Sequence, residues 1–290
     1  MNRRKFLQAS GAFLATAALA GVADVGLVEA NRPYVRKLDI PLDRLPQAFD
    51  GLTIVQLSDF HYDETFSATA IRHAVQIVNS LGPDLVVLTG DFVTSPSFSN
   101  RSHEVSRQAA QAADPCATLL RGLTARLGKV AVLGNHDLMT NAGLVTDALQ
   151  SQGIPVLRNR SVPLERAGAR IWLSGTDSCP PARHLDVTLN GVPRGEASIL
   201  LVHEPDIADA VSKYRVDLQL SGHSHGGQIR LPVIGPVYLP RFGRKYPWGL
   251  RKIGSLTLYT NAGIGTLGVP MRLNCPPEVT LFTLRTARTS

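Results

Sequence analysis

The chain has 290 residues, of which 44% are hydrophobic and 18% are charged, and its formal net charge at pH 7 is +7. This composition is typical of a globular protein with a sizeable core, and it argues against a disordered or low-complexity chain. The basic excess is modest and contains no long run of Lys or Arg. It suits a phosphate-bearing ligand or an anionic membrane surface, and no nucleic-acid-binding motif accompanies it.

The first thirty residues differ from the rest of the chain. A basic stretch at 3–5 precedes an Ala-, Gly- and Leu-rich run from about 9 to 28, and Val28-Glu29-Ala30 offers a small-residue cleavage site. This order is typical of an export signal, and its paired arginines resemble the twin-arginine type. An ordinary secretory signal or an uncleaved anchor is the alternative. We expect a signal or anchor segment at 1–30, a domain at 31–290, and a location in the periplasm or on the outer face of the cytoplasmic membrane.

Five short apolar runs follow, and each ends directly in a polar cluster. They span residues 52–57, 84–88, 129–133, 198–202 and 216–220. Such β-branched runs are typical of strands that are buried on both faces. Helical periodicity lies between them, at 70–78, within 104–127, and at 141–150 and 207–214. This alternation predicts a largely parallel sheet with right-handed crossovers.

The C-terminal part has a different pattern. After Gln228 the chain is rich in Pro and Gly, with short strand-like pieces at 255–260 and 278–284. We expect these pieces to form a second, more mixed sheet. The predicted fold class is therefore α/β, a four-layer α-β-β-α sandwich in which helices flank two packed sheets, within one domain.

Polar side chains follow all five predicted strands. Because ligands bind where the carboxyl ends of parallel strands meet, we expect these side chains to converge. They are Asp59, His61, Asp91, Asn135, His136, His203, His223 and His225. Burial of so many unpaired polar groups is costly, and metal coordination removes that cost. Two Asp, one Asn and four of these five His offer seven donors, which suits two ions of the Mn, Fe or Zn type better than one.

The segment Ser221–Gln228 also matches G-x-S-x-G, the nucleophile motif of serine hydrolases. In that class the catalytic His follows the Ser and the acid in the chain, and no His follows His225. The segment also reaches Pro232 without a helical period. We therefore interpret Ser224 as a spacer between two metal-binding histidines.

The ordered clusters resemble the five sequence blocks of the calcineurin-like metallophosphoesterases. The matching residues are Asp59-x-His61, Gly90-Asp91, Gly134-Asn135-His136-Asp137, His203 and Gly222-His223-Ser224-His225. The segments 261–265 and 272–278 resemble the tail of the exported bacterial branch of that family. The resemblance implies a phosphohydrolase that uses two metal ions.

The resemblance also implies a role for each side chain. Asp59, His61 and His225 would hold one metal, Asn135, His203 and His223 the other, and Asp91 would bridge them. A metal-bound hydroxide would attack phosphorus, and His136 would protonate or stabilise the leaving oxygen, with a supporting position beside the metals as its alternative role. Many relatives carry an acid at the position of Thr94 that orients this histidine, so we expect Asp137 or a backbone carbonyl to do so here.

Residues 236–248 mix aromatic side chains with Arg and Lys. They suit a rim that binds an amphiphilic phosphate ester or contacts an anionic membrane, and a packed surface loop is the alternative. We expect a monomeric enzyme that cleaves a phosphodiester or pyrophosphate. The alternative functions are hydrolysis of a lipid-linked phosphate and non-catalytic metal binding in the envelope. We interpret Cys116, Cys179 and Cys275 as buried small residues.

Overall fold

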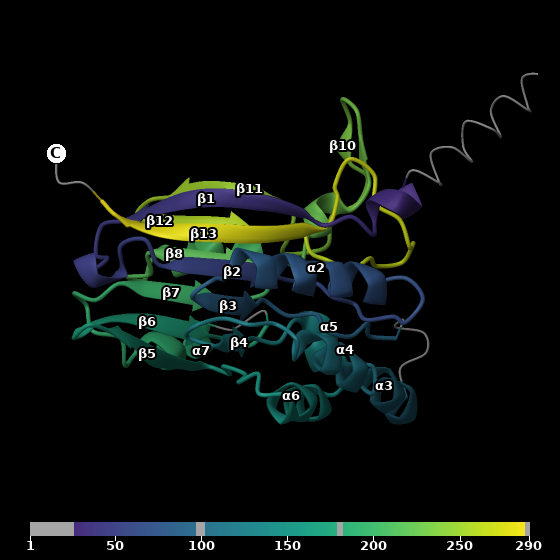
Figure 1. The fold of residues 1–290 in the computed structure, drawn as a ribbon, viewed down its shortest axis with the longest axis horizontal. Coiled ribbons are helices and arrows are strands. Elements are labelled where there is room, and N and C mark those ends of the chain that lie inside the picture. The colour runs from purple at the N-terminus through teal and green to yellow at the C-terminus, as the bar shows by residue number, and fades with distance from the viewer. Residues whose placement is uncertain (1–25, 97–101, 179–181, 288–290) are drawn as a thin grey trace, which may run out of the picture.

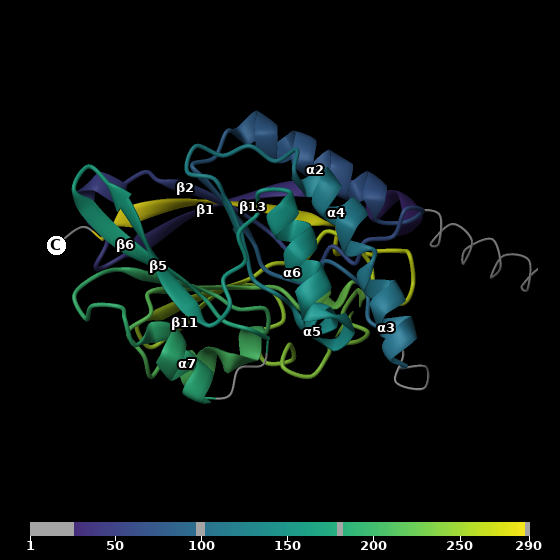
Figure 2. The ribbon, with the colours of Figure 1, turned by 90° about the horizontal axis from the view of Figure 1, so that it is seen from below.

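The computed structural model describes residues 26–96, 102–178 and 182–287, which form two β-sheets packed face to face with helices outside them (Figures 1 and 2). Three clusters of buried apolar side chains hold the layers together. One lies between the first sheet and its helices, one between the two sheets, and one between the second sheet and its helices. The predicted four-layer α/β sandwich is confirmed.

The first sheet has the strand order β1-β13-β2-β3-β4. Its strands are β1 (Tyr34–Leu42), β13 (Glu278–Thr286), β2 (Thr53–Leu57), β3 (Leu85–Leu88) and β4 (Lys129–Ala131). β2, β3 and β4 run parallel, and β13 pairs antiparallel with β2 and parallel with β1. The sheet is therefore mixed, and its three parallel strands end at one edge.

The second sheet has the strand order β11-β12-β8-β7-β6-β5. Its strands are β11 (Gly249–Ile253), β12 (Leu256–Thr260), β8 (Leu218–Ser221), β7 (Ser198–Leu201), β6 (Ala169–Gly175) and β5 (Arg160–Arg166). β12, β8, β7 and β6 are parallel, and the two outer strands are antiparallel to their neighbours. A separate hairpin joins β9 (Arg230–Leu231) to β10 (Gly235–Pro236).

The expected division of strands between the sheets is wrong. The C-terminal pieces do not form a sheet of their own, because β12 joins the second sheet and β13 inserts into the first. β13 takes an interior position because it is apolar on both faces. Phe282 and Leu284 pack between the sheets, whereas Val279 packs toward the helices. A strand with two apolar faces is stable only when both are covered.

The helices are α2 (Ala68–Leu81), α3 (His103–Ala110), α4 (Ala113–Leu120), α5 (Asn135–Thr140), α6 (Ala142–Ser151), α7 (Ala182–Leu189) and α8 (Ala208–Val211). Short 3₁₀ turns occur at Gln47–Phe49, Pro205–Ile207 and His225–Gly227. α2 buries the predicted apolar face and ends at Gly82 in a left-handed cap.

The helical region predicted within 104–127 is divided into α3 and α4. Pro115 lies in the first turn of α4. Proline lacks an N–H group and clashes with the carbonyl four residues earlier, so a helix accommodates it only near its start. Within the three described ranges, no helix is long and apolar enough to cross a membrane.

The N-terminal run predicted as a signal lies outside the described residues up to residue 25. The part that is described packs on the domain. Arg272 N donates to Gly26 O at 3.0 Å, and the Glu29 carboxylate accepts from the backbone N–H groups of Asn274 and Cys275 at 3.1 and 2.8 Å. Residues 26–29 are thereby attached to the segment that follows Met271.

Candidate metal centre

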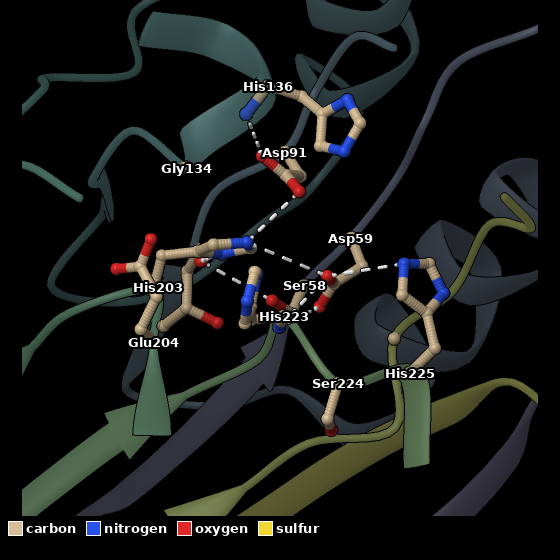
Figure 3. A network of polar contacts seen from close by, with 12 residues as sticks. Ser58, Asp59, Asp91, Gly134, His136, His203, Glu204, His223, Ser224 and His225 are labelled. Atoms are coloured by element: carbon tan, nitrogen blue, oxygen red, sulfur yellow. Dashed lines mark hydrogen bonds and ion pairs between the residues drawn. The ribbon is translucent and has the colours of Figure 1, made fainter. Parts of the chain in front are cut away.

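The carboxyl ends of strands from both sheets meet at one edge and carry the predicted polar residues (Figure 3). The first sheet supplies Asp59 and His61 after β2, Asp91 after β3, and Asn135 and His136 after β4. The second sheet supplies His203 after β7 and His223 and His225 after β8. Residues separated by more than 160 positions in the sequence are thereby brought into a single group.

Five of these residues have a backbone conformation that side chains other than glycine rarely adopt. The φ angles of Asp59, His61, Asp91, His223 and His225 lie between 40° and 71°. Each such residue costs on the order of 1–3 kcal/mol, so surrounding contacts must hold it in place. Asp59, for example, donates its N–H to Gly90 O at 2.9 Å and accepts at its carbonyl from Gly265 N at 2.7 Å. Strain concentrated in this way indicates a functional site.

The side chains form overlapping groups around Asp91. Ligand atoms of Asp59, His61 and His225 lie within 4.8 Å of one another, and so do those of Asp91, His203 and His223. Asp91 Oδ2 lies 3.0 Å from His203 Nε2 and 3.5 Å from His61 Nε2. Asp91 therefore stands between the two groups, where one carboxylate reaches both.

Three buried atoms in the cluster have no hydrogen-bond partner among the described residues: His61 Nε2, His203 Nε2 and Asn135 Oδ1. His203 Nε2 approaches Asp91 closely but not in hydrogen-bond geometry. Buried polar atoms without partners are costly and uncommon. Imidazole nitrogen and amide oxygen are both metal donors, so a pair of ions would satisfy these atoms.

The opposite nitrogen of each ring is held by a neighbour. His203 Nδ1 donates to Thr89 O at 2.7 Å, and His223 Nε2 donates to Arg241 O at 2.7 Å. Because a carbonyl oxygen only accepts, each of these nitrogens carries a proton, so in the neutral ring it is the other nitrogen that has the lone pair a metal needs. His61 Nδ1 lies 3.1 Å from Thr94 Oγ1. This contact holds the ring in place, but a hydroxyl both donates and accepts, so it does not by itself fix the position of the ring proton.

Burial and neighbouring charges set the protonation of the cluster. Burial, together with the charges of His136 and His203, lowers the pKa of His61 to about 3. Burial, His61 and Arg272 hold the pKa of His225 well below its usual range. These two rings are therefore neutral, as metal binding requires.

The pKa values of the two carboxylates, Asp91 and Asp59, shift in opposite directions. Burial alone would raise the pKa of Asp91, but His203, His136 and His61 hold it well below its usual range. Burial and the charge of Asp91 raise the pKa of Asp59. Although burial alone would lower it, Asp91 and Asp59 hold the pKa of His203 well above its usual range. The raised pKa means that His203 holds a second ring proton beside the carboxylates. A cation placed here would replace this proton as their partner.

His136 lies beside this group at the start of α5. Its N–H donates to Asp91 Oδ1 at 2.8 Å, and its ring Nδ1 accepts from Ser95 N at 2.9 Å. Of the two groups expected to orient this ring, Asp137 or a backbone carbonyl, Asp137 does not. Asp137 turns back toward the β3 loop and accepts from the backbone N–H groups of Asp91, Phe92, Val93 and Gly134.

A cleft of about 740 Å³ opens over the cluster. Asp91, Asn135, His136 and His223 lie at its polar side. Its apolar walls include Ile229, Val237, Tyr238, Phe242, Leu267 and Val269. Of the predicted rim at 236–248, the part up to Phe242 lines the cleft, and residues 243–248 are not among its lining residues. The contribution of 267–269 carried no signal in the sequence because it comes from a Gly-rich connection.

Arg272 is a supporting residue whose role the sequence did not indicate. It is fully buried, and its guanidinium donates to Gly265 O at 2.6 Å and to Cys275 O at 3.1 Å. Its Nη2 also lies 3.5 Å from His225 Nδ1. Cys275 and Cys116 are buried free thiols, as expected, and Cys179 lies outside the described residues.

Comparison with known proteins gives consistent matches. The family model for calcineurin-like phosphoesterases matches residues 52–227. The chain is 36% identical to the uncharacterised metallophosphoesterase YkuE of Bacillus subtilis, over 98% of both chains. It is 34% identical to a transmembrane protein with a metallophosphoesterase domain from Danio rerio, over 96% of this chain and 64% of that protein. It is 31% identical to the phosphodiesterase YaeI of Escherichia coli, over 98% and 99% of the two chains.

Proposed function

We propose that this protein is an exported phosphodiesterase. The chain belongs to the calcineurin-like phosphoesterases, and it is therefore a metal-dependent phosphoesterase that uses two divalent ions. The observation that carries this proposal is the position of Asp91 between two groups of donors. The similarity to YaeI, which is named a phosphodiesterase, supports a diester as the substrate.

We assign seven side chains to the two ions. Asp59, His61 and His225 hold one, Asn135, His203 and His223 hold the other, and Asp91 serves both. Mixed nitrogen and oxygen donors suit Mn, Fe or Zn. Ions bound here would supply an attacking oxygen from water at neutral pH and polarise the phosphoryl group.

His136 is placed to act on the leaving group. It lines the cleft, and one of its ring nitrogens lies within 4.8 Å of ligand atoms of His61 and Asp91. Because Ser95 N–H occupies Nδ1, the proton of the neutral ring is on Nε2. His136 therefore donates a hydrogen bond from Nε2 to the oxygen that leaves phosphorus.

Export is supported by the order of residues at the N-terminus, where paired arginines precede an apolar run. Substituting Lys for both Arg3 and Arg4 keeps the charge but removes the arginine pair. We expect the doubly substituted chain to stay in the cytoplasm, as measured by fractionation and immunoblotting. An unchanged distribution would contradict the twin-arginine assignment.

The catalytic proposal is tested by Asp91→Asn, with bis(p-nitrophenyl) phosphate as the substrate. Loss of a ligand shared by two ions removes several kcal/mol of transition-state stabilisation, so we expect kcat/KM to fall by about 1,000-fold or more. Asp39→Asn is the matched control, since that carboxylate is exposed and pairs with Arg285 away from the cluster.

Metal content by elemental analysis and circular dichroism accompany both variants. We expect Asp91→Asn to remain folded and to lose metal, whereas Asp39→Asn keeps both metal and activity. Unchanged turnover in Asp91→Asn would overturn the proposed site, and turnover that survives exhaustive chelation would overturn the metal-dependent mechanism.

A further inference from the structure

The β9–β10 hairpin stands out from the body of the protein (Figure 1), and Ile229 and Val237 at its two ends line the cleft. Its tip carries two large apolar side chains in solvent: Val233 is fully exposed and Ile234 is 74% exposed. Val237 and Tyr238 follow, with 60% and 67% exposure. Single exposed apolar residues are ordinary, but a contiguous group marks an interaction surface.

The backbone at the tip has a conformation that is costly for the residue that occupies it. Val233 has a φ of 69°, although β-branched residues rarely enter the left-handed region. A turn that needed only to connect two short strands would place Gly or Asn there at lower cost. The sequence thus keeps an apolar side chain at the position where it costs most, which indicates a use for that side chain.

The segment that carries the hairpin is basic. Residues 228–248 contain four Lys and Arg residues and no Asp or Glu. Arg241 and Arg244 are exposed next to the hairpin, and the Arg241 guanidinium lies 4.7 Å from the centre of the Phe242 ring. Lys245 is engaged by Asp209 at 2.6 Å. Exposed apolar side chains bordered by Arg and aromatic rings suit the interface of an anionic bilayer.

The root of the hairpin lies close to the point where the described chain begins. Asn274 Nδ2 donates to Arg230 O at 2.9 Å, and Leu273 bridges to Ile229. The same segment holds residue 26 through the Arg272 N to Gly26 O hydrogen bond. The chain therefore enters the described domain at residue 26 on the side that carries the hairpin, so a bilayer that received the apolar residues before it would also face the hairpin.

We propose that this docking rim, residues 229–242 with 267–269, binds the surface of an anionic bilayer, and that the cleft draws an amphiphilic phosphate ester from it. The substrate part of this inference rests on the proposed phosphodiesterase activity, whereas the docking part does not. A second copy of the chain is disfavoured as the occupant, because a symmetric contact would place the same basic surface against itself.

The cleft provides a continuous path for such an ester. Tyr238, Phe242 and Val269 are exposed and also line the cleft, so an alkyl chain can lie against them while the phosphate reaches Asp91 and His223. In the hydrolysis, the oxygen of water joins phosphorus, the bond from phosphorus to the leaving oxygen breaks, and the leaving group departs as an alcohol or phenol.

The docking is tested on the full chain with two variants that each add one indole at an exposed position. Ile234→Trp places it at the tip of the hairpin, and Val187→Trp is the control outside the rim. Val187 is 66% exposed and lies on α7, which packs against β5 and β6. Fluorescence is measured with vesicles of brominated phosphatidylcholine and phosphatidylglycerol, and the signal of the native Trp172 and Trp248 is subtracted with the wild-type chain.

We expect the bromines to quench the indole at position 234 and not the one at position 187, with weaker quenching when phosphatidylglycerol is omitted. Because the measurement reports which face meets lipid, attachment of the chain by its N-terminus does not obscure it. Absence of quenching at position 234, or equal quenching at both positions, would overturn the docking rim.

The substrate part is tested with two esters that share their scissile bond, ethyl p-nitrophenyl phosphate in solution and hexadecyl p-nitrophenyl phosphate in phosphatidylglycerol vesicles. We expect Val233→Ser combined with Ile234→Ser to lower turnover of the hexadecyl ester about tenfold, because two membrane-contacting apolar side chains are lost. Turnover of the ethyl ester should not change, and Val187→Ser should affect neither ester.

The outcomes separate the two proposals. Equal loss of both esters would show that the hairpin supports the metal site, which would overturn the membrane inference. A wild-type chain that cleaves neither ester would contradict the proposed activity, while the quenching experiment would still decide the docking. A tip variant that converts a dimer into a monomer in sedimentation would assign the rim to self-association instead.

Discussion

The metal cluster and the docking rim lie next to each other but are built in opposite ways. Asp59, His203 and Asp91 are almost completely buried, and hydrogen bonds from the surrounding loops hold their backbones or rings. The rim consists of short strands and turns, with Val233 and Tyr238 in solvent. The geometry of the cluster therefore depends on the packing of the fold, whereas the properties of the rim depend mainly on which side chains it exposes.

This difference indicates how one scaffold serves different substrates. Ligands at the ends of buried strands are positioned by two sheets at once, so their geometry changes only if the sheets move. A rim outside the core can change its side chains at little cost in stability, because surface substitutions usually alter the unfolding free energy by less than about 0.5 kcal/mol. If the rim selects the substrate as we propose, chemistry and substrate choice are separable in this protein.

The largest effect is expected from Asp137→Ala, which removes a residue that is not itself a ligand. Its carboxylate accepts four backbone N–H groups of the β3 and β4 loops, and the substitution leaves these donors buried without partners. We expect the unfolding free energy to fall by about 3–5 kcal/mol, with loss of metal and activity. Urea denaturation followed by elemental analysis checks this, and a chain of unchanged stability would contradict it.

A large effect confined to catalysis is expected from His136→Ala. This ring donates to the leaving oxygen in our proposal but holds no ion, so kcat should fall by about 100- to 10,000-fold while both ions stay bound. Steady-state kinetics and metal analysis of the same preparation measure both quantities. Loss of metal in step with activity would make His136 a ligand and contradict its assigned role.

A smaller effect is expected from Gly222→Ala, which tests how closely the two sheets approach. A Cβ at this position would lie 1.9 Å from Ser58 Oγ and 2.2 Å from Asp59 Oδ2, so Asp59 would have to shift. We expect metal affinity to fall about 10- to 100-fold, the range found when residues that orient ligands are changed.

Gly191→Ala is the matched control, because nothing lies within 4 Å of its added carbon. Competition with a fluorescent chelator measures the affinity of both variants. Equal affinity in the two variants would show that the contact between Gly222 and Asp59 does not position the ligand.

The smallest effect is expected in the rim, from Tyr238→Ala. The side chain is exposed and lines the apolar wall, so stability should change by less than about 0.5 kcal/mol. We expect KM for the hexadecyl ester to rise a few-fold, with KM for the ethyl ester unchanged. A loss of stability like that expected for Asp137→Ala would erase the distinction between cluster and rim.

The convergence of the polar residues could be predicted from the sequence because each one directly follows a short apolar run. Asp91, for example, comes three residues after the last residue of β3. The ends of parallel strands place such residues at one edge whatever the order of the strands. The four-layer arrangement could be predicted for the same reason, since alternating strands and helices leave few ways to cover both faces.

The sequence did not predict the residues whose position depends on long-range packing. The insertion of β13 between β1 and β2 depends on pairings across more than 200 residues, which no local pattern encodes. Arg272 and Ser95 come from irregular segments, and only the folded chain brings them to His225 and His136. Thr94 is instructive, because the position where the family resemblance implies an orienting acid holds a hydroxyl, and this hydroxyl contacts His61.

The most direct test of the account is a crystal structure of the metal-loaded protein with anomalous diffraction recorded at the absorption edge of the bound metal. We predict two anomalous peaks about 3.5–4 Å apart, with an oxygen of Asp91 in contact with both and Asp59 and His203 on different ions. A single peak, or two peaks that Asp91 does not join, would contradict the dinuclear centre on which the proposed chemistry depends.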